Sequence, residues 1–307
     1  MRKPRALRPG SVIAIVAPAS PAAPEAAARG ISLLQQRGYK VRIGKCCYWG
    51  DSGIRYDDEL RARELTDAWL DDEIEAIICV RGGYGCARIV DKLPLDEMAA
   101  AEKLFVGFSD ITTIHMALNR RGLATLHGPM PVTFESDRPD WVAKNWFAAL
   151  EGTGVIAQGS APAASTIAPG VAEGVVCGGC LSLIVDSLAT PYEWLPDGGL
   201  LLIEDVDEAP HRVDAMLTHL HHAGIFDRMS GIIVGEMTRS DPERSRGVGS
   251  PPWREVVLDR LSSLPLPSVI DFPFGHNKAM MSLPLGVRAR LDAGAGTLEY
   301  LELGVRH

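Results

Sequence analysis

Short apolar runs alternate with amphipathic stretches over the first half of the chain. The runs are rich in Val, Ile and Leu, as in buried parallel strands, and the stretches between them carry apolar residues at helical spacing. Strands are expected over 12–17, 39–43, 74–80 and 104–108 and around Thr125, and helices over 23–36, 57–70, 87–93, 110–120 and 142–150. This alternation predicts an α/β fold with a mainly parallel sheet flanked by helices.

The pattern changes after residue 150. Residues 151–169 are rich in Gly, Ala, Ser, Thr and Pro without periodicity, which predicts a linker. Further strands are expected over 174–176, 200–203, 232–234 and 269–272, helices over 181–188 and 212–223, and a hairpin from 287–292 and 297–301. We therefore expect an N-terminal α/β domain over 1–150 and a C-terminal α+β domain with more antiparallel character over 170–307.

Length and composition agree with two globular domains. The 307 residues exceed the length at which one core usually stops growing, about 250–300 residues, and 46% of them are hydrophobic. The net charge of −8, from 39 acidic and 31 basic residues, argues against a nucleic-acid partner. The longest apolar runs are far shorter than the roughly 18–20 residues that cross a bilayer, and the run 12–17 is too short for a signal peptide. We expect a cytoplasmic protein with no membrane partner.

Two groups of metal-binding residue types need an interpretation. Cys177 and Cys180 form a single CxxC motif with no second pair, so we interpret it as a glycine-rich turn between a strand and a helix, with a redox or metal role as the alternative. His219, His221 and His222 share an expected helix without an HExxH pattern, which favours solvated or capping roles over metal ligation. No metal or organic cofactor is expected.

The most informative stretch is 104–112, where an apolar strand meets a helix at Ser109 and Asp110. This context is typical of a nucleophile elbow, which exposes a serine at the carboxyl end of a sheet beside the free N–H groups of a helix start. Those N–H groups can hold an oxyanion. The G-x-S-x-G pattern fails at Ile111, and the spacing also fits Ser109 as an ordinary helix N-cap. A glycine-rich loop over 81–85 could supply a second N–H group or hold a phosphate.

A serine nucleophile needs a base and a carboxylate that orients it. His276 follows an expected strand on a glycine-containing loop, whereas His115 and His127 lie nearer to Ser109 in sequence, and spacing does not choose among the three. Glu204 directly follows an apolar strand and is a candidate for the carboxylate. Competing acidic residues are Asp205, Asp207 and Glu208.

Together these segments resemble the serine LD-carboxypeptidases, the family of muramoyl-tetrapeptide carboxypeptidases and microcin-C self-immunity proteins. The matching motifs are, in order, 16–20, 81–85, 107–110, 127–130, 203–205, 275–276 and 283–286. Several motifs in one order are far more specific than any one of them. One departure is Cys180, where family members often have Asn, and it puts the hydrogen bonding of that loop in doubt.

The resemblance implies roles for five residues. Ser109 is the nucleophile, His276 the general base and acid, and Glu204 the carboxylate that orients His276. The backbone N–H groups of Asp110 and Gly83 are the implied oxyanion donors. The resemblance also implies that the site lies in the cleft between the two domains.

The family's activity implies release of the terminal D-alanine from a muropeptide tetrapeptide, in peptidoglycan recycling, by a cofactor-free homodimer. A terminal carboxylate calls for a fork-shaped cation, and Arg81 and Arg212 are the candidates. The alternative within this fold is a self-immunity peptidase that cleaves a peptidyl or aminoacyl adenylate, with Trp141, Trp146 and Trp194 as possible stacking surfaces. A different class is a non-catalytic binding module, in which Ser109 is only a helix cap.

Overall fold

The computed structural model describes residues 1–48, 57–154, 161–245 and 247–307. Among them, one sheet has the strand order β11-β5-β4-β3-β1-β2. Its strands are β1 (Val12–Val16), β2 (Lys40–Ile43), β3 (Ala76–Cys79), β4 (Leu104–Gly107), β5 (Thr125–His127) and β11 (Leu283–Leu285). The strands β1 to β5 are parallel, and β11 is antiparallel to β5.

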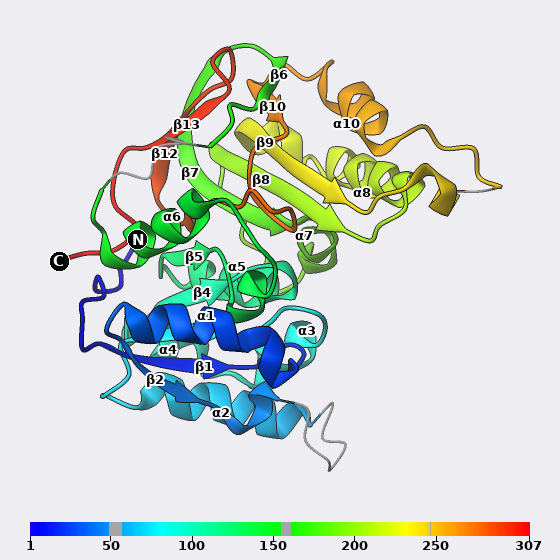
Figure 1. The fold of residues 1–307 in the computed structure, drawn as a ribbon. Coiled ribbons are helices and arrows are strands. Elements are labelled where there is room, and N and C mark those ends of the chain that lie inside the picture. The colour runs from blue at the N-terminus through cyan, green and yellow to red at the C-terminus, as the bar shows by residue number, and fades with distance from the viewer. Residues whose placement is uncertain (49–56, 155–160, 246) are drawn as a thin grey trace.

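Helices connect the parallel strands of this first sheet (Figure 1). They are α1 (Pro24–Gln36), α2 (Asp58–Leu70), α3 (Cys86–Ile89), α4 (Leu95–Ala100) and α5 (Thr112–Arg120), with three-ten turns η1 (Lys45–Cys47), η2 (Val90–Lys92) and η3 (Ser109–Ile111). The turn η4 (Pro131–Phe134) and the helix α6 (Asp140–Glu151) follow β5 and lead to the second sheet. Local sequence sets several boundaries: a proline opens α1, and the Asp57 side chain accepts a hydrogen bond from the N–H of Leu60 at the start of α2. All four residues of β3 are buried, as the uninterrupted apolar run predicts. The predicted α/β fold is confirmed.

The second sheet has the strand order β13-β12-β7-β8-β9-β10-β6. Its strands are β6 (Ser165–Ala168), β7 (Val171–Cys180), β8 (Gly199–Val206), β9 (Met229–Thr238), β10 (Ser268–Ile270), β12 (Arg288–Asp292) and β13 (Thr297–Tyr300). The helices are α7 (Leu181–Ser187), α8 (Pro210–His222), α9 (Ile225–Arg228) and α10 (Trp253–Leu261), with the turn η5 (Pro242–Ser245). The central strands β7 to β10 are parallel because helical segments connect them, so antiparallel pairing is confined to the edges. The predicted hairpin is the pair β12 and β13.

The stretch 177–180 is not the turn that the sequence predicts. It forms the end of β7, and Gly178 and Gly179 adopt positive φ within that strand. Cys177 and Cys180 are free and buried, and burial raises the pKa of Cys177 to about 12. A buried, protonated thiol is a poor nucleophile and a poor metal ligand, which disfavours a redox role.

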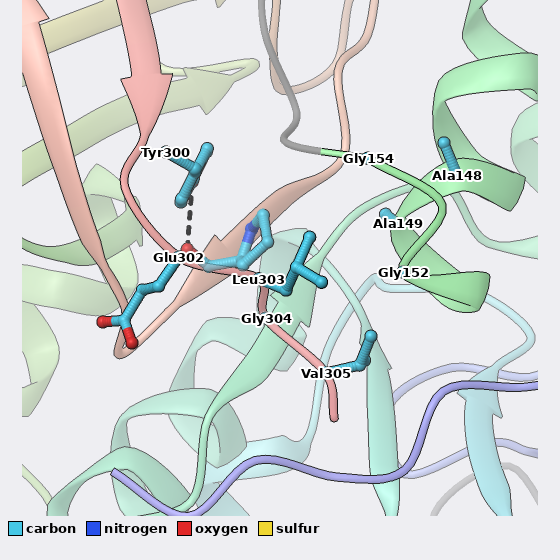
Figure 2. A pocket seen from close by; sticks show the side chains of 10 residues that line it. Ala148, Ala149, Gly152, Gly154, Tyr300, Glu302, Leu303, Gly304 and Val305 are labelled. Carbon is cyan, nitrogen blue, oxygen red and sulfur yellow. Dashed lines mark hydrogen bonds between the residues drawn. The ribbon is translucent and has the colours of Figure 1, made fainter. Parts of the chain in front are cut away.

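The two halves of the chain interlock. β11 comes from the second half yet forms the edge of the first sheet beside β5, and the chain end pairs with the chain start through the bond from the N–H of Arg306 to the carbonyl of Pro4. Figure 1 shows the two termini side by side. Figure 2 shows where the C-terminal tail passes α6. A cavity of about 10 Å³ lies between them, and the Tyr300 hydroxyl in its lining donates a hydrogen bond to the carbonyl of Pro284.

Residues 151–169, the predicted linker, include β6 at the edge of the second sheet, and 155–160 lie outside the described residues. The domain boundaries at 150 and 170 stay predictions. Among the described residues, no helix combines the length and the hydropathy that a bilayer crossing needs.

Candidate active site

Ser109 lies in a strained turn between β4 and α5. Its φ is +66°, in the left-handed region that L-residues enter only at a cost of roughly 1–2 kcal/mol. The N-cap of the three-ten turn η3 is Phe108, and no side-chain cap hydrogen bond is made there or at the start of α5. The interpretation of Ser109 as a helix cap is therefore wrong. The backbone strain instead turns the serine out of the sheet, as in a nucleophile elbow.

The structure brings Ser109, His276 and Glu204 together in one hydrogen-bonded chain. His276 Nε2 is 3.0 Å from Ser109 Oγ, and His276 Nδ1 is 2.6 Å from Glu204 Oε2. Glu204 lies on β8 and is fully buried, whereas the His276 side chain keeps 16% of its exposure. Because Nδ1 faces a carboxylate, it carries the proton, which leaves Nε2 as acceptor for the serine hydroxyl.

Electrostatics favour a basic His276. Burial acts to lower the pKa of its imidazole, but the charge and hydrogen bond of Glu204 outweigh burial, so the pKa lies above its ordinary value. Asp205 adds to the rise and Arg239 opposes it.

The acidic competitors of Glu204 have other partners. Burial and the charge of Glu204 raise the pKa of Asp205 to about 6, and its carboxylate accepts from the backbone N–H groups of Ser182 and Val206. Asp207 pairs with Arg239 and Arg244, and Glu208 lies 3.9 Å from Arg212. Among the four acids, only Glu204 contacts His276.

The two other candidate bases are buried away from the serine. His115 bonds the carbonyl of Gly107 through Nε2, and burial lowers its pKa to about 4. His127 is fully buried against the rings of Phe108 and Phe274, and burial also lowers its pKa. The tertiary structure thus selects His276 from the three histidines that the sequence left open.

Two glycines, Gly82 and Gly275, allow the close packing around Ser109 and Glu204 because they have no side chain. A Cβ at Gly82 would come within 2.8 Å of Ser109 Cβ, so the glycine-rich loop passes directly beside the serine. Gly275 has φ +91°, and a Cβ there would lie 2.4 Å from Glu204 Oε2. The dipeptide Gly275-His276 therefore lets the carboxylate reach the ring.

The two candidate oxyanion donors lie on the serine turn and on the neighbouring glycine-rich loop. The N–H of Asp110 belongs to the first turn of a helix, where no intrahelical acceptor exists. The Asp110 carboxylate is buried and accepts the N–H of Cys86, which ties the serine turn to α3. Gly83, with φ +111°, follows Gly82 in the same loop, and the loop is fixed to Ser20 through the bond from the N–H of Ser20 to the carbonyl of Gly82.

The proposed carboxylate-binding arginines occupy different positions. Arg81 is exposed at the carboxyl end of β3, next to Gly82 and therefore near Ser109. Arg212 is exposed on the first turns of α8 and forms a long ion pair with Glu208. Both arginines stay candidates, and Arg81 is the one that lies on the loop passing beside Ser109.

The remaining candidates form no second site. Trp146 is fully buried between Phe134 and Phe147 and is a core residue, while Trp141 and Trp194 are partly buried. Within the described ranges, no three His, Cys, Asp or Glu side chains gather as a metal site would require. The helical histidines are His219, His221 and His222 at the end of α8, where they can complement the helix dipole.

Two family models match the chain in sequence order. The model of the LD-carboxypeptidase N-terminal domain covers residues 13–128, and that of the C-terminal domain covers residues 173–291. The chain belongs to the LD-carboxypeptidase family. Ser109 lies within the first match, and Glu204 and His276 lie within the second.

Relatives that match nearly the whole chain include a Streptomyces coelicolor protein with a provisional carboxypeptidase name, which is 38% identical over 96% of this chain and 95% of its own. A Bacillus subtilis protein with a provisional name as a murein peptide carboxypeptidase is 32% identical over 99% and 95%. The crystal structure of muramoyltetrapeptide carboxypeptidase from Oxalobacter formigenes has a TM-score of 0.81 at 29% identity, over 94% of this chain and 97% of that one. The microcin C7 self-immunity protein MccF, bound to glutamyl sulfamoyl guanosine, has a TM-score of 0.89 over 100% of both chains, but at 22% identity the likeness is one of fold.

Sequence reasoning missed three residues that support the site. Phe108 packs its ring edge-on against His276, with centroids 4.9 Å apart, and Thr112 accepts the N–H of Cys180 at the end of β7. Arg138 donates to two backbone carbonyls just after His276. Phe108 and Thr112 flank the serine turn in sequence and could have been suspected there, whereas no sequence signal marks Arg138.

Proposed function

We propose that this protein is a serine LD-carboxypeptidase that releases the terminal D-alanine of muropeptide tetrapeptides. The observation that carries the proposal is the hydrogen-bonded chain Ser109–His276–Glu204, with the serine on a left-handed turn at the start of a helix. Family membership and the murein peptide carboxypeptidase relative support the substrate class.

The reaction begins with acyl transfer to the serine. Ser109 Oγ attacks the carbonyl carbon of the amide that joins the L-centre of the diamino acid to D-alanine, and its proton moves to His276 Nε2. Glu204 stabilises the imidazolium that results, because its negatively charged carboxylate accepts a hydrogen bond from Nδ1–H. The carbonyl oxygen becomes an oxyanion held by the N–H groups of Asp110 and Gly83.

Collapse of this intermediate breaks the C–N bond. His276 gives its proton to the departing amine, and D-alanine leaves with an ester remaining on Ser109. A water molecule then attacks the ester while His276 accepts its proton. The second collapse returns the proton to Ser109 and releases the shortened peptide, so atoms and protons balance without a cofactor.

Substrate recognition needs a cation for the terminal carboxylate. Arg81 is the better candidate because it adjoins Gly82, whose backbone passes beside Ser109, and its exposed guanidinium can bind a carboxylate with two parallel hydrogen bonds. The protein is expected to work in the cytoplasm in peptidoglycan recycling.

Mass spectrometry tests the activity directly. The purified protein is incubated with L-Ala-γ-D-Glu-(diamino acid)-D-Ala, carrying lysine or meso-diaminopimelate, and with an aminoacyl sulfamoyl adenylate. We expect loss of one alanine from a tetrapeptide, and no loss with Ser109→Ala. Cleavage of the adenylate with both tetrapeptides intact would instead favour the self-immunity activity. An intact set of substrates, with no fluorophosphonate labelling of Ser109, would favour the binding module.

A further inference from the structure

The segment that carries His276 has little regular structure. This loop runs from the end of β10 to the start of β11. Its two ends, which we call its neck, are joined by a hydrogen bond from the N–H of Met281 to the carbonyl of Pro273 at 2.7 Å. Within the loop, the Asn277 amide donates to the carbonyl of Phe274 at 3.4 Å, which is a long hydrogen bond. Internal contacts of this kind hold the neck of the loop more firmly than its tip, where His276 lies.

Contacts from the first half of the chain hold the tip. Arg138, just before α6, donates through Nη1 to the carbonyl of Asn277 at 2.6 Å and to that of Lys278 at 3.2 Å. Its Nε donates to the carbonyl of Thr133, which fixes the guanidinium to its own side of the molecule. The guanidinium therefore bridges the turn η4 and the two residues that follow His276.

The environment of Arg138 indicates that this bridge is its main role. The side chain is half-buried, and it makes no ion pair with any carboxylate in the part of the chain that the structure describes. A guanidinium that is partly removed from water and forms no ion pair needs hydrogen bonds to other polar groups to offset the lost hydration. Here the acceptors are three carbonyl oxygens. The planar guanidinium of arginine has fixed donor directions, so it holds these carbonyls in one geometry better than the flexible ammonium group of lysine would.

A neighbouring contact acts on the same segment. The N–H of Ser282 donates to the side-chain oxygen of Asn145, on α6, at 2.7 Å. Arg138 and Asn145 thus hold the tip of the loop and its return to β11, while Glu204, on β8, bonds the ring of His276. The loop and its histidine are therefore held by groups from both halves of the chain.

We propose that Arg138 is a positioning residue, which holds the His276 loop so that Nε2 stays within hydrogen-bond distance of Ser109. This inference rests on the proposed function and adds to it a residue outside the reacting groups. A shift of about 1 Å between a nucleophile and its base can cost on the order of 100-fold in rate, so loss of this bridge acts mainly on the chemical step.

The test compares Arg138→Gln and Arg138→Lys with a matched control, Arg29→Gln. Arg29 pairs with Asp137, next to Arg138, but the pair is exposed, and within the described residues Arg29 makes no hydrogen bond to Asn277 or Lys278. Three readouts are taken on the full chain: the rate at which a fluorophosphonate labels Ser109, kcat and KM on the tetrapeptide, and amide hydrogen exchange at Met281 and Ser282.

We expect Arg138→Gln to reduce the labelling rate and kcat by about 10- to 100-fold with KM changed far less, and to speed exchange at the loop amides. Arg138→Lys should lie between the glutamine variant and the wild type, and Arg29→Gln should match the wild type. If Arg138→Gln is too unstable to purify, the lysine variant carries the same comparison.

The outcomes separate the two claims. A folded Arg138→Gln protein that is labelled at the wild-type rate overturns the positioning role and leaves the proposed function intact. A loss confined to thermal stability, with the labelling rate per folded molecule unchanged, also overturns it. Wild-type protein that is neither labelled nor active overturns the proposed function, and the positioning role with it.

Discussion

At the scale of single residues, the candidate site depends on backbone conformations that few residue types tolerate. Ser109 adopts φ +66° although it has a Cβ, and the surrounding helix and strand must hold it there. Gly275 adopts φ +91° immediately before His276, and the absence of a side chain lets Glu204 approach the ring. One residue carries the strain and the other removes a steric obstacle to the same hydrogen-bonded chain.

The pH dependence of activity follows from this contact. Activity needs a neutral His276, and Glu204 raises the pKa of His276, so kcat/KM should rise with pH through a pKa above that of an ordinary histidine. In Gly275→Ala, the new Cβ would displace Glu204 Oε2, so the pKa of His276 should fall. We expect the acidic limb of the pH–rate profile to move to lower pH, and the maximal rate to drop by on the order of 10- to 100-fold.

Gly10→Ala is the matched control for this change. Gly10 has a similar φ of +95°, but a Cβ there would meet nothing within 4 Å. It therefore shares the backbone strain without the collision. An unchanged profile for Gly275→Ala, or an equal shift for Gly10→Ala, would contradict the account of the Glu204 contact.

At the scale of elements, the end of β7 is joined to the helix that follows the serine. The N–H of Cys180 donates to the hydroxyl of Thr112 at 3.1 Å, and the Cys180 thiol lies 3.4 Å from the Asp205 carboxylate. The link to α5 runs through the backbone N–H of Cys180, so it does not depend on which side chain occupies this position. The two sheets are thus coupled beside the site.

Thr112→Val tests this coupling. Valine has nearly the same shape but leaves the buried N–H of Cys180 without an acceptor, which should lower the free energy of unfolding by about 1–3 kcal/mol in urea titrations. Thr113→Val is the control, because Thr113 is also buried on α5 and its hydroxyl makes no hydrogen bond within the described residues. Equal stability losses in the two variants would argue against the link.

At the scale of the whole molecule, the chain length predicts two domains. The structure gives a physical reason why the first half should not fold well alone, since β11 (Leu283–Leu285) covers the edge of β5. A fragment of residues 1–150 would expose this edge and the apolar surface beneath it. The homodimer implied by the family stays a prediction, which light scattering can measure.

We expect fragment 1–150 to be largely insoluble and without activity, as measured by gel filtration and circular dichroism. A second fragment, with residues 280–287 joined after residue 152 through a Gly/Ser linker, restores the missing strand. It should be more soluble, yet inactive, because Glu204 and His276 are absent. A monomeric, cooperatively folded 1–150 fragment would contradict the role assigned to β11.

The sequence by itself determined the elements and the class of fold, because hydrophobic periodicity and glycine positions act locally. It also placed Ser109 at a strand-to-helix junction, where the residue types on either side set the turn. It could not choose among His115, His127 and His276, or between Glu204 and its acidic neighbours, without the family resemblance.

Those choices depend on contacts between residues 72 and 167 positions apart, which only the tertiary structure brings together. The structure also decided that β11 belongs to the first sheet and that Arg138 reaches the His276 loop. Both are long-range pairings that leave no local periodic signal, because the partner of each group is fixed by packing and not by its neighbours in the chain.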